Sequence, residues 1–455
     1  METFLQRAVR SLYGLGLRAA QPLLRRKLAR RGVAEPGYLE AVEERFGRYD
    51  TAAPAASGLR IWVHAVSLGE TRAAAVLVAA LRERLPGMQL LLTHGTATGR
   101  AEGTRLLQPG DLQAWQPWDT PGAVARFLAH FRPSMGLLME TEVWPNLVAG
   151  CRQAGVPLCL ANARLSAKSL REAERLAVLA QPAFGGLAAV WAQSDGDAER
   201  LRTLQAPVHG VFGNLKFDMA PDPALLARGQ AWHAAAGRPV LLFASSREGE
   251  EQLWIEALGR FRSLAQAGRA QGAADSIANR PLWLIVPRHP QRFDAVAALL
   301  QDAGLTVARR STWGDAPPVE AAAADVWLGD SLGEMALYYG AADAALLGGS
   351  FAPLGGQNLI EAAACGCPVV TGPSTFNFAE AADGATAAGA AFRTTGIDEA
   401  IATACRLIDD PAALAAAQAA GRRFAAAHRG AAARTADAAV TLLRNAAAER
   451  RRPAA

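Results

Sequence analysis

The chain has 455 residues, of which 51% are hydrophobic and 20% charged, and its formal net charge at pH 7 is +5. This length favours two domains of about 200 residues each, and the composition suits a well-packed α/β protein. Five cysteines form no C-x-x-C motif and no even set, which argues against a disulfide framework or a cysteine metal site. The sequence contains neither the run of about 20 apolar residues that indicates a spanning helix nor a typical secretory signal.

The first segment, residues 1–36, alternates apolar residues with arginines and then adds a dense basic cluster between Arg18 and Arg31. This amphipathic, cationic pattern is typical of a segment that lies in the headgroup region of an anionic membrane. The alternative is a pair of solvated helices packed on the first domain. No aromatic platform for stacking bases follows the basic cluster, so we expect no nucleic-acid partner.

Residues 37–220 predict an N-terminal Rossmann-like domain in which strands alternate with helices. Its first strand, 61–64, leads through AVSLGE into a helix over 71–85, and a second strand follows at 90–93. Glu70 therefore lies at the carboxyl end of a strand and the start of a helix, where open α/β sheets bind their ligands. An acid at a helix start is also a common partner of the helix dipole, so Glu70 alone is ambiguous.

Two further strand ends in this domain are polar. The strand 135–139 runs into METEVWPNL, where Glu140 and Glu142 share one apolar-flanked turn. Two such glutamates cost desolvation energy unless they pair with cations or hold a functional proton, although they could also cap the next helix. A strand over 156–160 is followed by NARLSAKS, whose loop supplies Arg164, Ser166 and Lys168. We expect carboxylates and cations to converge at this edge of the sheet.

The segment SDGDAERL contains a D-x-D pair, Asp195 and Asp197, of the kind that holds a divalent metal in other transferases. Here the pair opens a helix directly, so Ser194 or Asp195 as N-cap and Asp197 in the first turn explain it without a metal. The strand 208–212 and GNLKFD follow, which places Lys216 near the exit to the second domain. Residues 221–238 are expected to be the linker.

Residues 239–430 predict a second, nucleotide-sugar-binding Rossmann-like domain with strands at 240–244 and 282–286. The second of these strands ends in PRHPQRF, which places Arg288 and His289 where a phosphate would bind, although His289 could equally be a packed, neutral imidazole. A helix opened by GDSLGEM follows. Residues 431–455 predict a C-terminal helix and a basic tail.

The stretch 343–373 has the pattern of a single ligand-binding motif. A buried strand ending at Leu347 precedes a glycine-rich loop, whose glycines let the backbone turn sharply and approach a ligand. Asn358 then stands at the start of a helix over 359–364 as an N-cap or a ligand-reading amide, and Glu361 lies where a carboxylate accepts hydrogen bonds from ribose hydroxyls. An ordinary βαβ unit is the plainer interpretation, but the order of these elements resembles the nucleotide-sugar half of GT-B glycosyltransferases.

Several ordered blocks together resemble the 3-deoxy-D-manno-oct-2-ulosonic acid (Kdo) transferases of lipopolysaccharide assembly: HAVSLGE, METEVWPNL, NARLSAKS, QSDGDAERL, GNLKFD, PRHPQRF, DSLGEM and GGSFAPLGGQNLIE. The resemblance implies a GT-B fold, with two Rossmann-like domains facing a central cleft. It also implies CMP-β-Kdo as donor, the lipid A precursor as acceptor, inversion at the anomeric carbon, and neither a metal nor another cofactor. The expected location is the cytoplasmic face of the inner membrane, with the N-terminal segment at the anionic membrane surface.

Residue by residue, the resemblance implies that Glu70 is the general base and that Glu140 and Lys216 stabilise the transition state. The positions implied for the CMP site are Arg288, His289, Leu332, Gly333, Glu334, Asn358, Leu359, Ile360 and Glu361. The chain has Gln357 and Leu359 where His and Pro are expected in many members of the family.

Three alternatives remain at this stage. The first two are another GT-B nucleotide-sugar transferase and a nucleotide-sugar epimerase, which would not need the basic N-terminus. The third is a non-catalytic nucleotide-sugar-binding protein, which would be indifferent to loss of Glu70. A Rossmann dehydrogenase is set aside because no G-x-G-x-x-G follows a strand.

Overall fold

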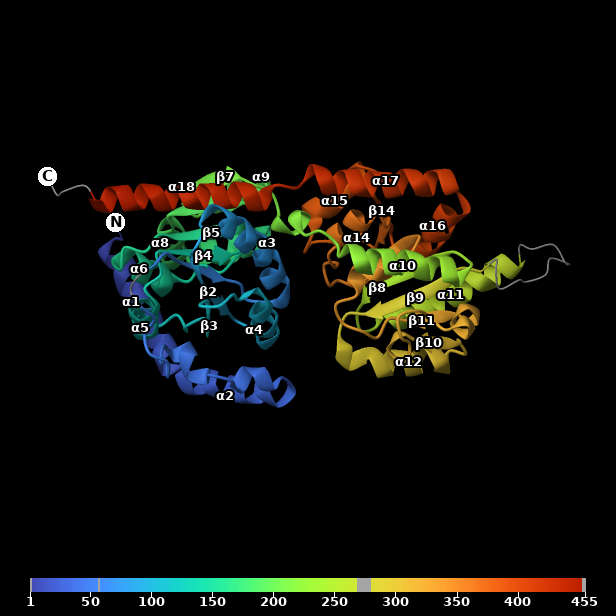
Figure 1. The fold of residues 1–455 in the computed structure, drawn as a ribbon, viewed down its shortest axis with the longest axis horizontal. Helices are drawn as coiled ribbons and strands as arrows, with labels where there is room; N and C mark the ends of the chain where they lie inside the picture. Colours follow the sequence, from blue (N-terminus) through green and yellow to red (C-terminus); the bar gives the residue numbers. More distant parts are fainter. Residues whose placement is uncertain (1, 56–57, 268–279, 452–455) are drawn as a thin grey trace. The chain divides into compact units, whose positions relative to one another are not determined.

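The structure, a computed structural model, describes residues 2–55, 58–267 and 280–451 (Figure 1). The chain forms two compact units, of which the first comprises Met1–Asp218 and Arg429–Ala455 and the second comprises Met219–His428. Each unit is built on one seven-stranded sheet in which every strand pair is parallel. Met1 and residues 452–455, the ends of the expected terminal segments, lie outside the described residues.

The sheet of the first unit has the strand order β3-β2-β1-β4-β5-β6-β7. Its strands β1, β4 and β5 are buried along their whole length, as expected for parallel strands covered by helices on both faces. Successive strands are added on one side of β1 up to β3 and on its other side from β4 onward, so the switch point of the sheet lies between β1 and β4. Open α/β sheets bind their ligands at such a switch point. The strands are β1 (Arg60–His64), β2 (Gln89–His94), β3 (Leu112–Trp115), β4 (Met135–Met139), β5 (Leu158–Ala163), β6 (Ala189–Ala192) and β7 (Val208–Val211).

Helices cover both faces of this sheet over two separate cores. Ile61 and Val63 of β1 pack in the core that includes residues of α3 and α18, and α18 lies along α3. Trp62 points to the other face and packs on Phe127 of α5. The helices of the unit are α1 (Phe4–Ala19), α2 (Gln21–Ala34), α3 (Leu68–Arg84), α4 (Ala97–Gly103), α5 (Pro121–Phe131), α6 (Pro145–Gln153), α7 (Ala167–Arg175), α8 (Ala177–Gly185), α9 (Asp195–Thr203) and α18 (Ala431–Arg451).

The sheet of the second unit has the order β10-β11-β9-β8-β12-β13-β14, with its switch point between β8 and β12. Its strands are β8 (Val240–Ser246), β9 (Leu282–Pro287), β10 (Val307–Arg309), β11 (Val326–Leu328), β12 (Ala344–Leu347), β13 (Val369–Thr371) and β14 (Ala391–Arg393). Its helices are α10 (Pro223–Ala236), α11 (Glu250–Ala267), α12 (Phe293–Asp302), α13 (Met335–Gly340), α14 (Ile360–Cys365), α15 (Ala379–Ala387), α16 (Ile397–Asp409) and α17 (Pro411–Ala427).

Most of the predicted strands begin and end within a residue or two of the observed strands. The segment expected to be a linker instead contains a helix. Residues 221–238 contain α10, a helix of the second unit whose Trp232 is 2% exposed. Asp222 caps this helix through its side chain and Pro223 occupies its first turn, which are ordinary start signals for a helix. Among the described residues, no helix has the length and apolar character needed to cross a membrane.

Candidate active site

Glu70 lies at the switch point of the first sheet, in the first turn of α3 directly after β1. The helix begins there because the side chain of Ser67 accepts a hydrogen bond from the backbone N–H of Glu70. In return the Glu70 carboxylate accepts hydrogen bonds from the backbone N–H of Val66 at 2.8 Å and from the Ser67 hydroxyl at 3.1 Å. Burial, and after it the charge of Glu140, raise the pKa of Glu70 to about 7. Glu70 thus has the proton affinity that suits a general base near neutral pH.

Glu140 ends the neighbouring strand β4 and faces two cations. Its Oε1 lies 2.9 Å from Nζ of Lys216, and its Oε2 lies 4.0 Å from a guanidinium nitrogen of Arg164. Glu140 is 9% exposed and its backbone has φ of +59°, which is uncommon for a residue with a side chain and is concentrated at functional sites. The expected convergence of carboxylates and cations is confirmed for Glu140 and Arg164, and the structure adds Lys216 to them.

Asn162, at the end of β5, is a site residue that sequence analysis missed. It is 2% exposed with φ of +53°. Its Oδ1 accepts a hydrogen bond from the backbone N–H of Leu215 at 2.9 Å, which fixes the turn that presents Lys216. Its Nδ2 is buried with no hydrogen-bond partner in the described part of the chain. A buried amide without a partner needs an explanation, but in the sequence this asparagine looks like ordinary turn chemistry.

Glu142 and Lys168, two further charged residues expected at this edge, differ in their surroundings. Glu142 accepts a hydrogen bond from the indole N–H of Trp144 at 2.8 Å, and burial raises its pKa. Lys168, by contrast, has a side chain that is 80% exposed and lies 4.0 Å from Glu172 of the same helix, so it is not part of the ionic cluster around Glu140.

The capping interpretation of the D-x-D segment is confirmed. Ser194 is the N-cap of α9, and its side chain accepts a hydrogen bond from the backbone N–H of Asp197. The Asp197 carboxylate in turn accepts a hydrogen bond from the backbone N–H of Leu165 at 2.8 Å. The described residues contain no group of three or more His, Cys, Asp or Glu side chains that could hold a metal.

In the second unit, cationic side chains gather after β8 and β9. Arg288 follows β9, and its backbone N–H donates to the Ser246 carbonyl at 2.9 Å. Partial burial and the charges of Arg247, Arg288 and Arg292 lower the pKa of His289, so this imidazole is neutral at pH 7. The cluster of Arg247, Arg288, His289 and Arg292 has the composition of an oxyanion site.

The adjacent carboxylate Glu251 holds one of these cations in place. It is fully buried and faces the Arg292 guanidinium with two hydrogen bonds of 2.8 and 3.0 Å. The Ser246 hydroxyl donates a third hydrogen bond to Glu251 at 2.7 Å. Arg292 is therefore a fixed element of the cationic edge.

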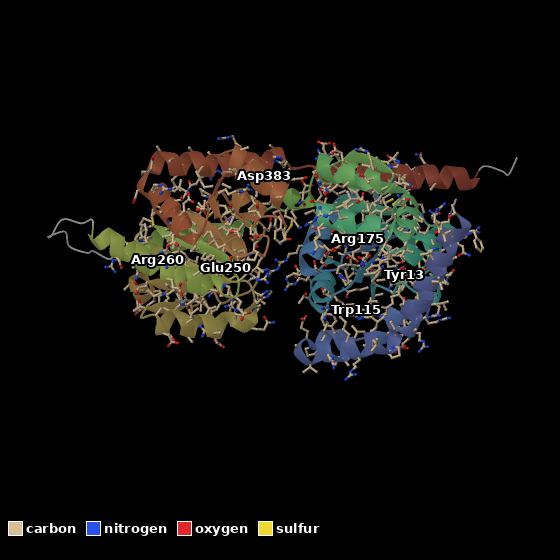
Figure 2. The ribbon with its side chains drawn as sticks, turned by 180° about the vertical axis from the view of Figure 1, so that it is seen from behind. Tyr13, Trp115, Arg175, Glu250, Arg260 and Asp383 are labelled. Atoms are coloured by element: carbon tan, nitrogen blue, oxygen red, sulfur yellow. The ribbon has the colours of Figure 1, made fainter. Side chains whose placement is uncertain are left out.

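The glycine-rich loop after β12 is organised by Glu250, a fully buried residue in the first turn of α11 (Figure 2). Its carboxylate accepts hydrogen bonds from the backbone N–H groups of Gly349 at 2.7 Å, Phe351 at 3.0 Å and Arg247 at 2.9 Å. A side chain at Gly348 would place its Cβ 2.2 Å from the carbonyl oxygen of Ser245. The close packing against Ser245 thus explains why residue 348 is a glycine, and Glu250 is the acceptor for these loop N–H groups. Close approach to a ligand is not needed to explain either feature.

Leu332, Gly333 and Glu334, which the resemblance assigns to the CMP site, differ in how they could contact a ligand. Leu332 is 73% exposed, and Gly333 adopts a φ of +81° that favours glycine. The Glu334 carboxylate forms two hydrogen bonds of 3.0 Å with the Arg310 guanidinium, and it also pairs with Arg228. Glu334 is therefore engaged within the protein.

At α14, only part of the expected segment presents side chains. Leu359 and Ile360 are each 1% exposed, so their side chains do not face a ligand. Asn358 caps the helix start through its Oδ1, which accepts a hydrogen bond from the backbone N–H of Ile360 at 3.1 Å, while the helix N-cap position itself is Leu359. Glu361 is half-buried in the first turn.

Two α/β units, each built on a parallel sheet with polar residues at its carboxyl edge, define a protein with a GT-B-like fold. The structure of Anabaena Alr3699/HepE in complex with UDP-glucose covers 84% of this chain with a TM-score of 0.55, and the chain covers 99% of it at 14% identity, a likeness of fold alone.

Comparison with known sequences identifies the family. A family model described as 3-deoxy-D-manno-octulosonic-acid transferase (kdotransferase) matches residues 40–219. The 3-deoxy-D-manno-octulosonic acid transferase of Bordetella pertussis is 52% identical over 94% of this chain and 98% of its own length. That of Haemophilus influenzae is 33% identical over 82% of this chain and 84% of its own. The chain belongs to the 3-deoxy-D-manno-octulosonic acid transferase family, which sets the epimerase and the non-catalytic binding protein aside.

Proposed function

We propose that the enzyme transfers Kdo from CMP-β-Kdo to the lipid A precursor, with inversion and with Glu70 as general base. Glu70 takes the proton of the acceptor hydroxyl as the oxygen of that hydroxyl bonds to the anomeric carbon of Kdo. The bond from this carbon to the phosphate oxygen breaks on the opposite face, and CMP leaves with the electron pair. The place of Glu70 at the switch point of the first sheet, half-buried and oriented by two hydrogen bonds, is the observation that carries this assignment, and its raised pKa is consistent with it.

The charge that develops during transfer needs fixed cations. Lys216 is held against Glu140 at 2.9 Å, and fixed groups of this kind stabilise a transition state without the cost of reorganisation. We assign stabilisation of the transition state to Lys216 and to Glu140, which holds the Lys216 ammonium in place to meet the negative charge, including the carboxylate that Kdo brings.

On the donor side, we assign the CMP phosphate to the cationic edge with Arg288 and His289, and the ribose hydroxyls to Glu361. Arg247 joins this assignment because its charge acts on His289 together with that of Arg288. Asn358, Leu359 and Ile360 contribute the backbone of the same segment. Leu332 and Gly333 offer an exposed turn, and Glu334 supports that turn through Arg310.

The test measures the mass of the lipid product. Purified protein is incubated with CMP-Kdo, generated in place, and the tetraacylated disaccharide bisphosphate, beside Glu70→Gln and a matched control, Glu83→Gln. Glu83 lies on the same helix with a side chain that is 78% exposed. We expect the mass of one or more Kdo units to be added by the wild type and the control. Glu70→Gln should be slower by about 10² to 10⁴. No mass gain with authentic donor and acceptor would refute the proposed substrates, and a full rate in Glu70→Gln would refute the base.

We further propose that α1 associates with the anionic cytoplasmic face of the inner membrane. Its large apolar residues Phe4, Leu5, Leu12 and Leu15 are each at least 59% exposed, and their spacing places them on one helix face. Leu12→Glu should release the protein from vesicles that contain phosphatidylglycerol, whereas Val319→Glu, the same kind of change at a residue of the second unit that is 90% exposed, should sediment like the wild type. Equal sedimentation of all three proteins would refute this role of α1.

A further inference from the structure

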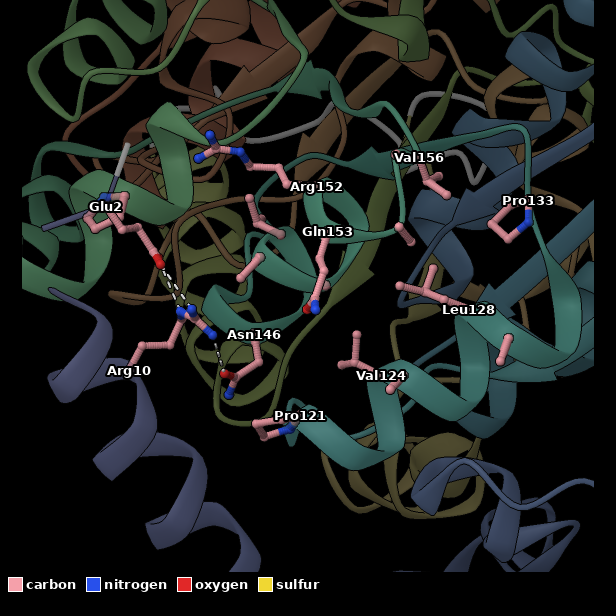
Figure 3. Close-up of a pocket in the computed structure, with 18 of the residues that line it drawn as sticks. Glu2, Arg10, Pro121, Val124, Leu128, Pro133, Asn146, Arg152, Gln153 and Val156 are labelled. Atoms are coloured by element: carbon pink, nitrogen blue, oxygen red, sulfur yellow. Dashed lines mark hydrogen bonds and ion pairs between the residues drawn. The ribbon is translucent and has the colours of Figure 1, made fainter. Parts of the chain in front are cut away.

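A surface groove of about 1090 Å³ runs along the first unit between α5 and α6, with α1 and Pro182 of α8 at its side (Figure 3). Its floor is apolar and includes Val124 and Leu128 of α5 and Val148 of α6, all buried. The groove extends from the first turns of α5 and α6 to the residues that precede β4 and β5. One end therefore adjoins the start of α6, just after the loop with Glu140 and Glu142.

The rim of this groove is strongly basic. Four arginines line it, against the single acid Glu2. Among the described residues, Arg7, Arg132 and Arg152 form no ion pair, and all three are exposed. Arg10 is paired with Glu2 through hydrogen bonds of 3.1 and 2.9 Å, so its charge is already compensated within the protein. The four arginines of the rim are Arg7, Arg10, Arg132 and Arg152.

The contact between α1 and this groove is specific. Tyr13 forms a side-chain hydrogen bond with Asp119, a residue that is 4% exposed. The Asp119 carboxylate also accepts hydrogen bonds from the backbone N–H groups of Asn146 at 3.1 Å and Leu147 at 2.7 Å, which caps α6. A side chain at Gly14 would meet Pro121 at 3.0 Å, so α1 packs closely here. Helix α1 is thus fixed with Arg7 and Arg10 toward the groove and its apolar stripe toward solvent.

We propose that this groove binds one anionic phospholipid of the membrane, with the phosphate at the rim arginines that form no ion pair in the described part of the chain and part of an acyl chain on the apolar floor. The charge of the rim complements a headgroup phosphate, and the floor removes apolar chain surface from water. The same helix, α1, presents its apolar stripe to the bilayer, so lipid and membrane meet the protein through one element. The proposal rests on the membrane-facing role of α1 but not on sugar transfer.

The test uses the full-length protein and soluble dihexanoyl phosphatidylglycerol below its micelle concentration, without donor. Titration calorimetry and native mass spectrometry should show one molecule bound per chain, with dihexanoyl phosphatidylcholine and inorganic phosphate each bound at least tenfold more weakly. Arg152→Glu should weaken phosphatidylglycerol binding about tenfold. The matched control Arg202→Glu, in the last turn of α9 and exposed, makes the same charge change and should have no effect.

A second variant, Ala129→Trp, fills the groove from an exposed position of α5 and leaves all four arginines in place. It should abolish binding of the short-chain lipid without lowering the thermal unfolding midpoint, and Glu70→Gln should bind lipid like the wild type. The proposal is overturned if Arg202→Glu weakens binding as much as Arg152→Glu, or if binding survives Ala129→Trp. Equal affinity for inorganic phosphate would show an anion site only, and equal affinity for phosphatidylcholine would remove the role of charge.

Discussion

The ammonium of Lys216 lies 2.9 Å from Oε1 of Glu140, although the two residues are 76 positions apart in the chain. Their side chains are 13% and 11% exposed, so this ion pair is largely removed from water. The end of β4 presents Glu140, and the hydrogen bond from Leu215 to Asn162 fixes the turn that presents Lys216. The fold thereby builds one oriented cation beside the carboxylate neighbour of Glu70.

Replacing Lys216 by Met should leave the Glu140 carboxylate buried without its closest cation. Because an unpaired buried charge is costly, we expect the first unit to lose about 3 kcal/mol of unfolding free energy and kcat to fall about 10² or more. Urea unfolding and steady-state kinetics at saturating donor measure these effects. Lys216→Arg keeps the charge and should restore most of the stability. Unchanged kcat and unfolding free energy in Lys216→Met would contradict the assignment of an electrostatic role.

The pH dependence should report Glu70. A general base acts only when deprotonated, so kcat/KM should rise with pH through a midpoint of about 7, the pKa of Glu70. Burial is the main cause of this raised pKa and the charge of Glu140 the second. Glu140→Gln should therefore move the midpoint below 7 without restoring the pKa of a free glutamate. An unchanged midpoint in Glu140→Gln would contradict the coupling of the two carboxylates.

Protonation of Glu70 at low pH should lower the activity without destabilising the folded protein. Its pKa is raised in the folded state, so the folded protein binds the proton more tightly than the unfolded chain. The stabilisation from this group is complete below the unfolded pKa near 4.5 and disappears as pH rises toward 7. Thermal unfolding of the wild type and Glu70→Gln between pH 5 and pH 8 separates this effect from catalysis.

The sequence predicted the strands and the acidic edge of the first sheet because buried runs such as β4 stand next to Glu140 in the chain. It did not predict that Lys216 meets Glu140, since that contact depends on the register of β4 and β5 and on the turn after β7. Asn162 was missed for the same reason, because nothing local separates it from a turn asparagine. The helix start at Asp222 was visible in the sequence, and the linker interpretation overlooked it.

The second unit was harder to predict, because carboxylates there have partners that are distant in sequence. Glu334 pairs with Arg310, which lies 24 positions earlier. Glu250 takes the loop N–H groups that the glycine pattern seemed to offer to a phosphate, across about 100 positions. A glycine-rich loop in a sequence indicates that the backbone bends, but only the fold shows which group meets its donors.

Asn162→Ala should remove the acceptor for the buried N–H of Leu215 and loosen the turn with Lys216. An unsatisfied buried donor costs about 1 to 3 kcal/mol, so both the unfolding free energy and kcat should fall. Asn162→Asp keeps an acceptor for Leu215 but adds a carboxylate near Glu140 and Glu70. We expect this variant to keep more stability than Asn162→Ala and to move the midpoint of the pH–rate profile upward. Identical profiles for Asn162→Asp and the wild type would contradict the placement of Asn162 at the active site.

Glu250→Gln should loosen the glycine-rich loop and the backbone of Arg247 at the cationic edge. The Glu250 carboxylate accepts hydrogen bonds from the backbone N–H groups of Gly349, Phe351 and Arg247. In a glutamine an NH₂ group, which cannot accept, replaces one of the two oxygens, so at least one of these hydrogen bonds is lost. Hydrogen bonds to a charged group are worth about 2 kcal/mol each, and the unfolding free energy of the second unit should fall by about that amount.

The kinetic consequence of Glu250→Gln should fall on the donor. Arg247 belongs to the cationic edge and receives its backbone orientation from Glu250, so KM for CMP-Kdo should rise severalfold while the acceptor KM stays unchanged. Glu248→Gln, two positions away and exposed, makes the same chemical change outside the loop and is the matched control. Steady-state kinetics with each substrate varied in turn decides the matter. A rise in acceptor KM alone, or an equal effect in Glu248→Gln, would separate Glu250 from the donor site.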